Sequence, residues 1–273
     1  MPQPQKFYDR LSGRVAIVTG AGSQGPGFGT GKAISVAFAR EGAKVCLVDL
    51  YPERAEETRQ LIVDVGGDAF VHAGDITDSA VCAAIVQATL ERYGRLDVLV
   101  NNVGVSGGYA EIWDMDEAHW SRHVDANLKS CVLMTKHAMR PLIESKRGSI
   151  INIASTAALL ASGGAFAYGP AKAAMIHFTR EIAVKYGRKG VRANAICPGH
   201  IVTPHVAGFF DEAAFEVRRK VAPLGITGDA WDIATAAVFF AGHDSRFVTA
   251  ACLAVDGGVT QTMQMTAHAL IND

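Results

Sequence analysis

Short runs of β-branched and other apolar residues recur along the chain and alternate with longer segments of helical spacing. The runs predict strands at residues 15–19, 44–49, 69–72, 98–101, 150–154, 191–196 and 252–255. The segments between them predict helices at residues 31–41, 52–65, 79–93, 117–142, 167–186 and 229–240. Strands that alternate with helices of this length indicate right-handed βαβ units. The pattern therefore predicts an α/β fold, a doubly wound parallel sheet covered by helices on both faces, in three layers.

No internal repeat and no linker-like segment interrupts this alternation. The chain has 273 residues, a length at which one α/β domain can bury a full core. We therefore expect residues 1–273 to form a single domain. In an open parallel sheet, ligands bind beyond the carboxyl ends of the strands, where the strand order reverses. The residues that follow each predicted strand are therefore the ones to search for chemistry.

Composition limits the partners and the environment of the protein. Apolar residues make up 49% and charged residues 19%, and the formal net charge is −1. This balance is typical of a globular protein and gives no general attraction to nucleic acid or anionic membranes. Residues 1–10 are polar, and no apolar run approaches the roughly 20 residues that a membrane span needs. We expect a soluble, cytoplasmic protein without a nucleic-acid or membrane partner.

Cysteine and histidine spacing gives little sign of a disulfide framework or a metal site. The five cysteines stand singly, without a CxxC pair, and their odd number argues against a set of disulfides. They are expected to be small core residues. The histidines form neither HExxH nor a comparable ligand spacing, so no catalytic metal is expected.

A glycine-rich loop follows the first predicted strand. Residues 20–31 read Gly-Ala-Gly-Ser-Gln-Gly-Pro-Gly-Phe-Gly-Thr-Gly and directly precede a predicted helix. Glycines let the backbone turn tightly and approach a pyrophosphate, whose charge the N–H groups at a helix start can bind. Many surface turns are rich in glycine, but a position between a first strand and a first helix favours a dinucleotide-binding loop. Such a loop is typical of a Rossmann-like fold.

Asp49 ends the second predicted strand, 18 residues after Gly31. This is close to the spacing of about 20 expected for the acid that binds the adenosine ribose hydroxyls. A carboxylate there would repel a 2′-phosphate. The loop has no Lys or Arg before Lys32, and Leu50 and Tyr51 follow the acid, so nothing obvious would neutralise that phosphate. An aspartate that only caps the next helix is the alternative, but loop and acid together favour NAD over NADP as the cofactor.

A tyrosine and a lysine provide candidate chemistry. Tyr168 and Lys172 are four residues apart, on one face of the helix predicted at 167–186. An ammonium there favours a phenolate and lowers the pKa of a tyrosine from its unperturbed value of about 10. A phenolate can accept the proton of an alcohol while hydride leaves for a nicotinamide. Ser155, after the strand predicted at 150–154, could stabilise charge on the reacting oxygen, or it could only satisfy local backbone.

These residues, with Asn-Asn-Val-Gly at 101–104 and Asn127 in Asp-Ala-Asn-Leu-Lys, resemble the short-chain dehydrogenase/reductase family over about residues 14–259. The resemblance implies that Tyr168 is the acid/base, Lys172 its activator and ribose anchor, Ser155 the donor to the substrate oxygen, and Asn127 a relay residue. Taken alone, Asn127 could merely tie its helix to a neighbouring carbonyl. The resemblance also implies a cofactor-binding and catalytic core at residues 14–200, a substrate lid at 203–223, and a homotetramer.

The same resemblance implies further cofactor contacts. Asp75 and Ile76 resemble the adenine-binding pair, and Ile201 and Thr203 resemble the residues that hold the carboxamide. The complete expected cofactor set is Gly20, Ser23, Gly29, Gly31, Asp49, Asp75, Ile76, Asn102, Gly104, Tyr168, Lys172, Ile201 and Thr203. The family's first turn usually has three residues between its first glycine and the closing Gly-x-Gly, whereas eight lie between Gly20 and Gly29. Which residues of this longer loop contact a pyrophosphate therefore stays open.

The sequence thus predicts an NAD-dependent oxidoreductase that interconverts a small secondary alcohol and a ketone. Apolar residues dominate residues 155–168 and 203–223, which predicts a mainly apolar, cyclic or aromatic substrate. His200 and His205, on either side of Thr203, could bind a polar substituent or face water. One alternative is a reductase of 3-oxoacyl thioesters, although such relatives usually prefer NADPH. Another is a nucleotide-sensing regulator without chemistry, which would have little need for the four candidate catalytic residues together.

Overall fold

The computed structural model describes residues 9–106, 111–161 and 166–272, and its centre is one parallel sheet of seven strands. The strand order is β3-β2-β1-β4-β5-β6-β9. The strands are β1 Val15–Thr19, β2 Lys44–Asp49, β3 Ala69–Ala73, β4 Val98–Asn101, β5 Gly148–Ile153, β6 Val191–Pro198 and β9 Cys252–Val255. All seven predicted strands are confirmed, with ends that differ by at most two residues.

The sheet is doubly wound. From β1 the chain adds β2 and β3 on one side, then returns to place β4, β5 and β6 on the other side. Strand order therefore reverses between β1 and β4, and their carboxyl ends leave a crevice of the kind that binds ligands in such sheets. β1, β4 and β5 are buried along their full length, as expected for strands covered on both faces.

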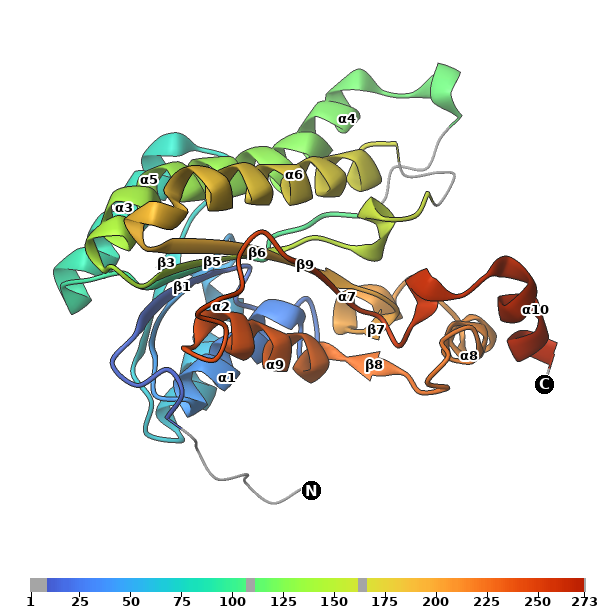
Figure 1. The fold of residues 1–273 in the computed structure, drawn as a ribbon, viewed down its shortest axis with the longest axis horizontal. Helices are drawn as coiled ribbons and strands as arrows, with labels where there is room; N and C mark the ends of the chain where they lie inside the picture. Colours follow the sequence, from blue (N-terminus) through green and yellow to red (C-terminus); the bar gives the residue numbers. More distant parts are fainter. Residues whose placement is uncertain (1–8, 107–110, 162–165, 273) are drawn as a thin grey trace.

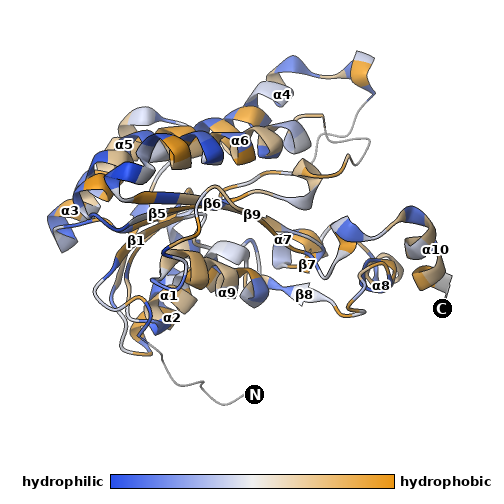
Figure 2. Ribbon diagram, viewed as in Figure 1, coloured by the Kyte–Doolittle hydropathy of each residue, from blue (hydrophilic) through white to orange (hydrophobic). Residues whose placement is uncertain are grey.

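Helices cover both faces of the sheet and complete the three layers (Figure 1). One face carries α1 Thr30–Arg40, α2 Pro52–Val63 and α9 Ala230–Ala241. The other carries α3 Ser79–Tyr93, α5 Ser130–Glu144 and α6 Tyr168–Tyr186. The inner strands are mostly hydrophobic, whereas the helices mix hydrophobic and hydrophilic residues (Figure 2). The predicted Rossmann-like single domain is confirmed.

The helix predicted at 117–142 is present without a break from residue 117 to 144, but it contains a π-helical turn that the prediction did not include. The structure has α4 Glu117–Val124, then a π-helical turn at Asp125–Lys129, then α5. The apolar periodicity runs through the turn, so it did not reveal the extra residue per turn. Single π-helical turns inside α-helices occur frequently at functional sites, and this one contains Asn127.

Several short elements lie beyond the carboxyl edge of the sheet. A two-stranded parallel ribbon pairs β7 Ile201–Val202 with β8 Gly228–Asp229. The helices α7 Pro204–Ala207 and α8 Glu212–Lys220 lie near it, and α10 Gln264–Asn272 packs against α8 (Figure 1). Among the helices of residues 9–106, 111–161 and 166–272, none has the length and apolar character required to cross a membrane.

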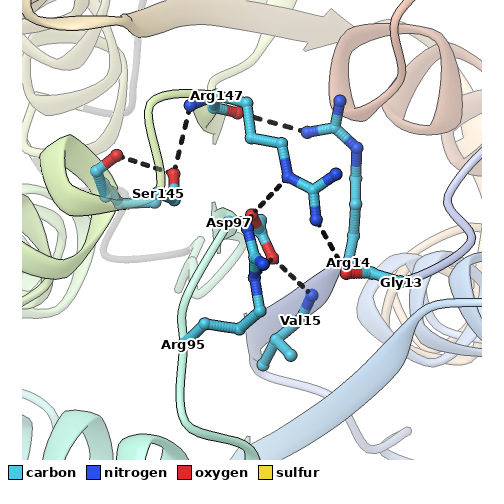
Figure 3. A network of polar contacts seen from close by, with 8 residues as sticks. Gly13, Arg14, Val15, Arg95, Asp97, Ser145 and Arg147 are labelled. Carbon is cyan, nitrogen blue, oxygen red and sulfur yellow. Dashed lines mark hydrogen bonds and ion pairs between the residues drawn. The ribbon is translucent and has the colours of Figure 1, made fainter.

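The amino edge of the sheet is fastened by a buried carboxylate (Figure 3). Asp97, fully buried just before β4, accepts hydrogen bonds from the Val15 amide at 3.0 Å, the Arg95 guanidinium at 2.7 Å and the Arg147 guanidinium at 2.8 Å. Burial alone would raise the pKa of Asp97, but these bonds outweigh it and lower the pKa below its ordinary value. The network joins the starts of β1, β4 and β5 at the edge opposite the crevice.

Candidate active site

The glycine-rich loop follows β1 and is shaped by close backbone contacts. Gly20 has a φ of +63°, a conformation that favours glycine. A Cβ on Gly31 would overlap the carbonyl oxygen of Gly20, and a Cβ on Gly22 would overlap Arg54. The loop can therefore lie flat against the start of α1 and of α2 only with glycines at these positions. Gly22 was not among the predicted site residues, although the glycine spacing of the loop contained the signal.

Asp49 lies at the end of β2 and faces the loop. Its carboxylate accepts hydrogen bonds from the amide of Gly22 at 2.9 Å and from the amide of Tyr51 at 3.1 Å. Each oxygen accepts one of these bonds, so each keeps capacity to accept a bond from a ribose hydroxyl. The half-buried acid is thus held in place by backbone rather than by a neighbouring cation.

A cavity of about 300 Å³ lies between β1, β2 and β4 at the carboxyl edge of the sheet. Eight predicted cofactor residues line it: Gly20, Ser23, Gly29, Gly31, Asp49, Asn102, Gly104 and Thr203. The structure therefore brings together residues that lie far apart in the sequence. The N-cap of α1, Gly29, makes no side-chain cap bond, and the first turn of α1 has no acidic residue. A helix start of this kind suits the negative charge of a pyrophosphate.

Two residues near Asp49 line the same cavity and had not been predicted. The guanidinium of Arg54 lies 4.0 Å from the centre of the Tyr51 ring, in a cation–π contact. The sequence interpretation found nothing obvious to neutralise a 2′-phosphate after Asp49, and Arg54 corrects it. Arg54 is in the first turn of α2. Its short distance in sequence from Pro52, at the helix start, was the only signal that could have placed it near Asp49. An acid, Asp49, and a cation, Arg54, thus both line the cavity.

Asp75, Ile76 and Ile201 do not line this cavity among the described residues. The Asp75 carboxylate accepts hydrogen bonds from the amide and the hydroxyl of Thr77, at 2.9 and 2.8 Å. Ile201 is buried in β7 and, with His200, lines a second cavity of about 130 Å³. His200 therefore faces away from the first cavity, whereas His205 lines it.

Lys172 is held by the ends of two strands. Its ammonium donates to the carbonyl oxygens of Ile153 at 2.9 Å and Val103 at 3.2 Å, and only 2% of the residue is exposed. It lies 5.9 Å from the centre of the Tyr168 ring, one helical turn away on α6. Burial lowers the pKa of Lys172 to about 8. The lysine is thus fixed between β4, β5 and Tyr168.

Asn127 fastens the loop after β4. Its Nδ2 donates to the carbonyl oxygens of Val105 and His123, and its Oδ1 accepts from the amide of Val105 at 3.1 Å. A Cβ on Gly104 would lie 3.2 Å from Lys172 Nζ and 3.3 Å from Asn127 Oδ1. Gly104 therefore lies directly beside both side chains, and the π-helical turn brings Asn127 there.

Asn102 and Ser155 also make local bonds. The Asn102 amide donates to the Thr19 hydroxyl, and its Nδ2 donates to the carbonyl oxygens of Thr19 and Gly20. Asn102 thus ties the end of β4 to the end of β1. The Ser155 oxygen accepts from the amide of Ala157 at 3.1 Å. Its hydroxyl hydrogen can still be donated to a substrate oxygen.

Comparisons with known proteins identify relatives over most of the chain. The family model described as enoyl-(acyl carrier protein) reductase matches residues 26–260. A (+)-borneol dehydrogenase 2 of Salvia officinalis is 34% identical, over 95% of this chain and 93% of that protein. A 3-oxoacyl-(acyl-carrier-protein) reductase of Chlamydia muridarum is 36% identical, over 91% of this chain and 98% of that protein.

A solved structure shares the whole fold. The crystal structure of a short-chain dehydrogenase/reductase from Burkholderia xenovorans has a TM-score of 0.88 and 39% sequence identity, and the match covers 93% of this chain and 99% of that one. The protein is an oxidoreductase that acts on CH–OH groups, in a class that uses NAD(P). The chain belongs to the short-chain dehydrogenase/reductase family.

Proposed function

We propose that the protein is an NAD-dependent dehydrogenase that interconverts a secondary alcohol and a ketone on a mainly apolar, cyclic or aromatic substrate. One observation carries the proposal: the cavity lined by the glycine-rich loop and Asp49 reaches Gly104, directly beside Lys172 and Asn127. A dinucleotide bound in this cavity would run from the acid at the end of β2 towards the Tyr168–Lys172 pair.

The preference for NAD rests on Asp49. Its carboxylate faces the cavity and is positioned by two backbone amides. Two acceptor oxygens suit the paired hydroxyls of a ribose, whereas a 2′-phosphate would meet like charge. Arg54 lines the same cavity and could offset part of that repulsion, so the size of the preference is set by both residues.

The residues of this chain divide the chemistry among them. When bound, the nicotinamide accepts or returns a hydride. The Lys172 ammonium stabilises Tyr168 as a phenolate, which accepts the proton of the alcohol hydroxyl and becomes the neutral phenol. The Ser155 hydroxyl donates a hydrogen bond to the reacting oxygen. We keep Asn127 as the proposed relay residue, because its side chain and that of Lys172 lie against the same glycine.

The proposed lid, residues 203–223, and the loop after Ser155 supply the substrate side. Large apolar side chains are exposed there, among them Phe209, Phe210, Leu159 and Leu160. Exposed apolar groups beside a candidate site favour an apolar ligand. The name of the borneol dehydrogenase relative, whose alcohol is cyclic, agrees with this substrate class.

The homotetramer is also part of the proposal. The exposed apolar side chains of Trp120 on α4 and Val184 on α6 support packing of these helices against another copy. The molar mass in solution, measured by light scattering after size-exclusion chromatography, tests this directly.

The second candidate is a reductase of 3-oxoacyl thioesters. The family-model description and the Chlamydia muridarum relative favour it. One experiment separates the candidates: kcat/KM with NAD and cyclic secondary alcohols against kcat/KM with NADPH and acetoacetyl thioesters. A higher value for the NADPH-dependent thioester reaction would overturn the proposed function in favour of the second.

A further inference from the structure

The glycine-rich loop is longer than the family turn it resembles, and its additional residues contact the start of the proposed lid. A Cβ on Gly25 would lie 3.6 Å from Pro204 Cβ, and a Cβ on Gly27 would lie 3.6 Å from Pro204 Cγ. These are ordinary van der Waals separations. The additional residues therefore pack against the first turn of α7 instead of extending into solvent.

The far end of the same loop is anchored on α9 and α1. The Phe28 ring lies 4.9 Å from the Trp231 ring, centre to centre, and packs against the core. The ammonium of Lys32 lies 5.5 Å from the Phe28 ring centre. The loop thus has a fixed base next to the start of α1, and its middle residues contact α7.

His205 connects the loop to two other segments. Its Nδ1 lies 2.8 Å from Gln24 Oε1, and its Nε2 lies 3.1 Å from the Ser106 hydroxyl. An amide oxygen can only accept, so Nδ1 carries the hydrogen and Nε2 accepts from the serine. A neutral imidazole satisfies both bonds, and burial lowers the pKa of His205, which favours that form.

The three connected segments are three walls of the cofactor cavity. Gln24, Val105 and His205 all line it, together with Gly22 and Asp49. Gln24 belongs to the loop after β1, Ser106 to the loop after β4, and His205 to α7. The hydrogen-bonded series Gln24–His205–Ser106 therefore joins three segments that line the cavity.

We propose that Gln24, His205 and Ser106 form a clamp that closes the cavity over a bound dinucleotide and slows its release. The proposal rests on the proposed dinucleotide-binding function. A ligand held between these walls leaves more readily when the walls can separate, and separation breaks both bonds of His205. Because release of product or cofactor limits turnover in many enzymes, the clamp would set kcat as well as affinity.

The test is the rate constant of NADH release from the purified protein, followed by the loss of NADH fluorescence in stopped-flow displacement. Replacing His205 with Ala removes both bonds and should raise this rate constant about tenfold, and Ser106→Ala about threefold, the factors expected for bonds of ordinary net strength. Gln24→Ala should raise it about twofold, because Gln24 is exposed and water competes for its bond. The double variant Gln24→Ala/His205→Ala should match His205→Ala alone, since the second change removes a bond already lost.

Matched controls separate the clamp from a general loss of stability. Ser106→Thr keeps the hydroxyl and should stay near the wild-type rate constant, as should His243→Ala, which alters an exposed histidine outside the cavity. The NADH association rate constant and the melting temperature without cofactor should be unchanged in Gln24→Ala. Unchanged release from His205→Ala and Gln24→Ala that still bind NADH would overturn the clamp alone. Absence of NADH binding by the wild type would overturn the clamp and the proposed function together.

Discussion

The side-chain nitrogen of Lys172 lies 5.9 Å from the centre of the Tyr168 ring, and the hydrogen bonds found for this nitrogen go to carbonyl oxygens at the end of β5 and in the loop after β4. These carbonyls belong to Ile153 and Val103, so β4 and β5 position the lysine relative to α6. Burial lowers the pKa of Lys172 to about 8. The ammonium is therefore present near neutral pH, and a modest rise in pH removes it.

If Tyr168 is the acid/base, replacing it with Phe should reduce kcat by at least about 10²-fold, the usual effect of losing such a group. NADH affinity and the melting temperature should change little, because only a hydroxyl is removed. The measurement is steady-state alcohol oxidation at saturating NAD. A variant that keeps more than about a tenth of the rate would contradict the assignment.

Lys172→Met should move the pH–rate profile of alcohol oxidation to higher pH and weaken NAD binding. Without the ammonium, a phenolate at Tyr168 loses the nearby positive charge and forms only at higher pH. In the wild type the stabilisation of the Tyr168 phenolate by Lys172 should decline as pH rises through about 8, where Lys172 loses its proton. Profiles of kcat from pH 6 to 10 at saturating NAD check the prediction, and superimposable profiles would count against an electrostatic role.

Asp49→Ala should reduce the ratio of kcat/KM for NAD to that for NADP. The change removes the carboxylate that would repel a 2′-phosphate and leaves Arg54 in the same cavity. The matched variant Asp49→Ala/Arg54→Ala should lose part of the gained activity with NADP, because the remaining cation is gone. A ratio that stays at the wild-type value in Asp49→Ala would refute the role of this acid.

Asp97→Asn should lower the free energy of unfolding by about 2 kcal/mol at pH 7, because a buried carboxylate loses bonds to two arginines. We expect a smaller loss of stability than for a fully buried ion pair, because the side chains of Arg95 and Arg147 are about 40% exposed and can be solvated by water. Urea unfolding measures the difference. Asp244→Asn, at an exposed position, is the control.

The pKa of Asp97 also predicts how this difference varies with pH. The folded protein lowers this pKa, so the unfolded chain binds the proton more readily and the carboxylate contributes stability above its ordinary pKa. That contribution is lost as pH falls through the lowered value in the folded state. The wild type and Asp97→Asn should therefore converge in strongly acidic urea titrations. A constant difference down to the lowest pH would contradict the network as its source.

The sequence was sufficient to predict the strands of the sheet and the positions of candidate site residues on the strands and helices, because both depend on local patterns. The strand ending at Asp49 and the helix face shared by Tyr168 and Lys172 are examples. The π-helical turn at Asn127 was missed, since apolar spacing continues through it. Arg54 was not predicted as a cavity residue, and His205 was left between binding a polar substituent and facing water. Only the fold brings the start of α2 and α7 against the loop after β1. The Asp75 carboxylate accepts two hydrogen bonds from Thr77. The motif alone did not reveal this local partner, which competes with a cofactor for the carboxylate.

The last prediction concerns the substrate. Phe209 and Phe210 are 60% and 40% exposed, and the Arg218 guanidinium lies 4.4 Å from the Phe210 ring centre. Arg218 is half-buried against this ring, and burial lowers its pKa. His200 bonds the backbone carbonyl oxygen of Arg218, and neither residue lines the first cavity.

An apolar lid should therefore favour cyclohexanol-like and aryl alcohols over polyols and sugar acids. The measurement is kcat/KM across a size-matched panel with NAD. Phe210→Ala should lower kcat/KM for cyclohexanol by about tenfold, close to the transfer free energy of a buried ring, and should affect 2-propanol much less. Phe247→Ala, which alters a ring that is 96% exposed away from the cavity, should leave both values unchanged. A clear preference for polyols or sugar acids, or an equal loss for both alcohols in Phe210→Ala, would show that the lid does not select apolar substrates.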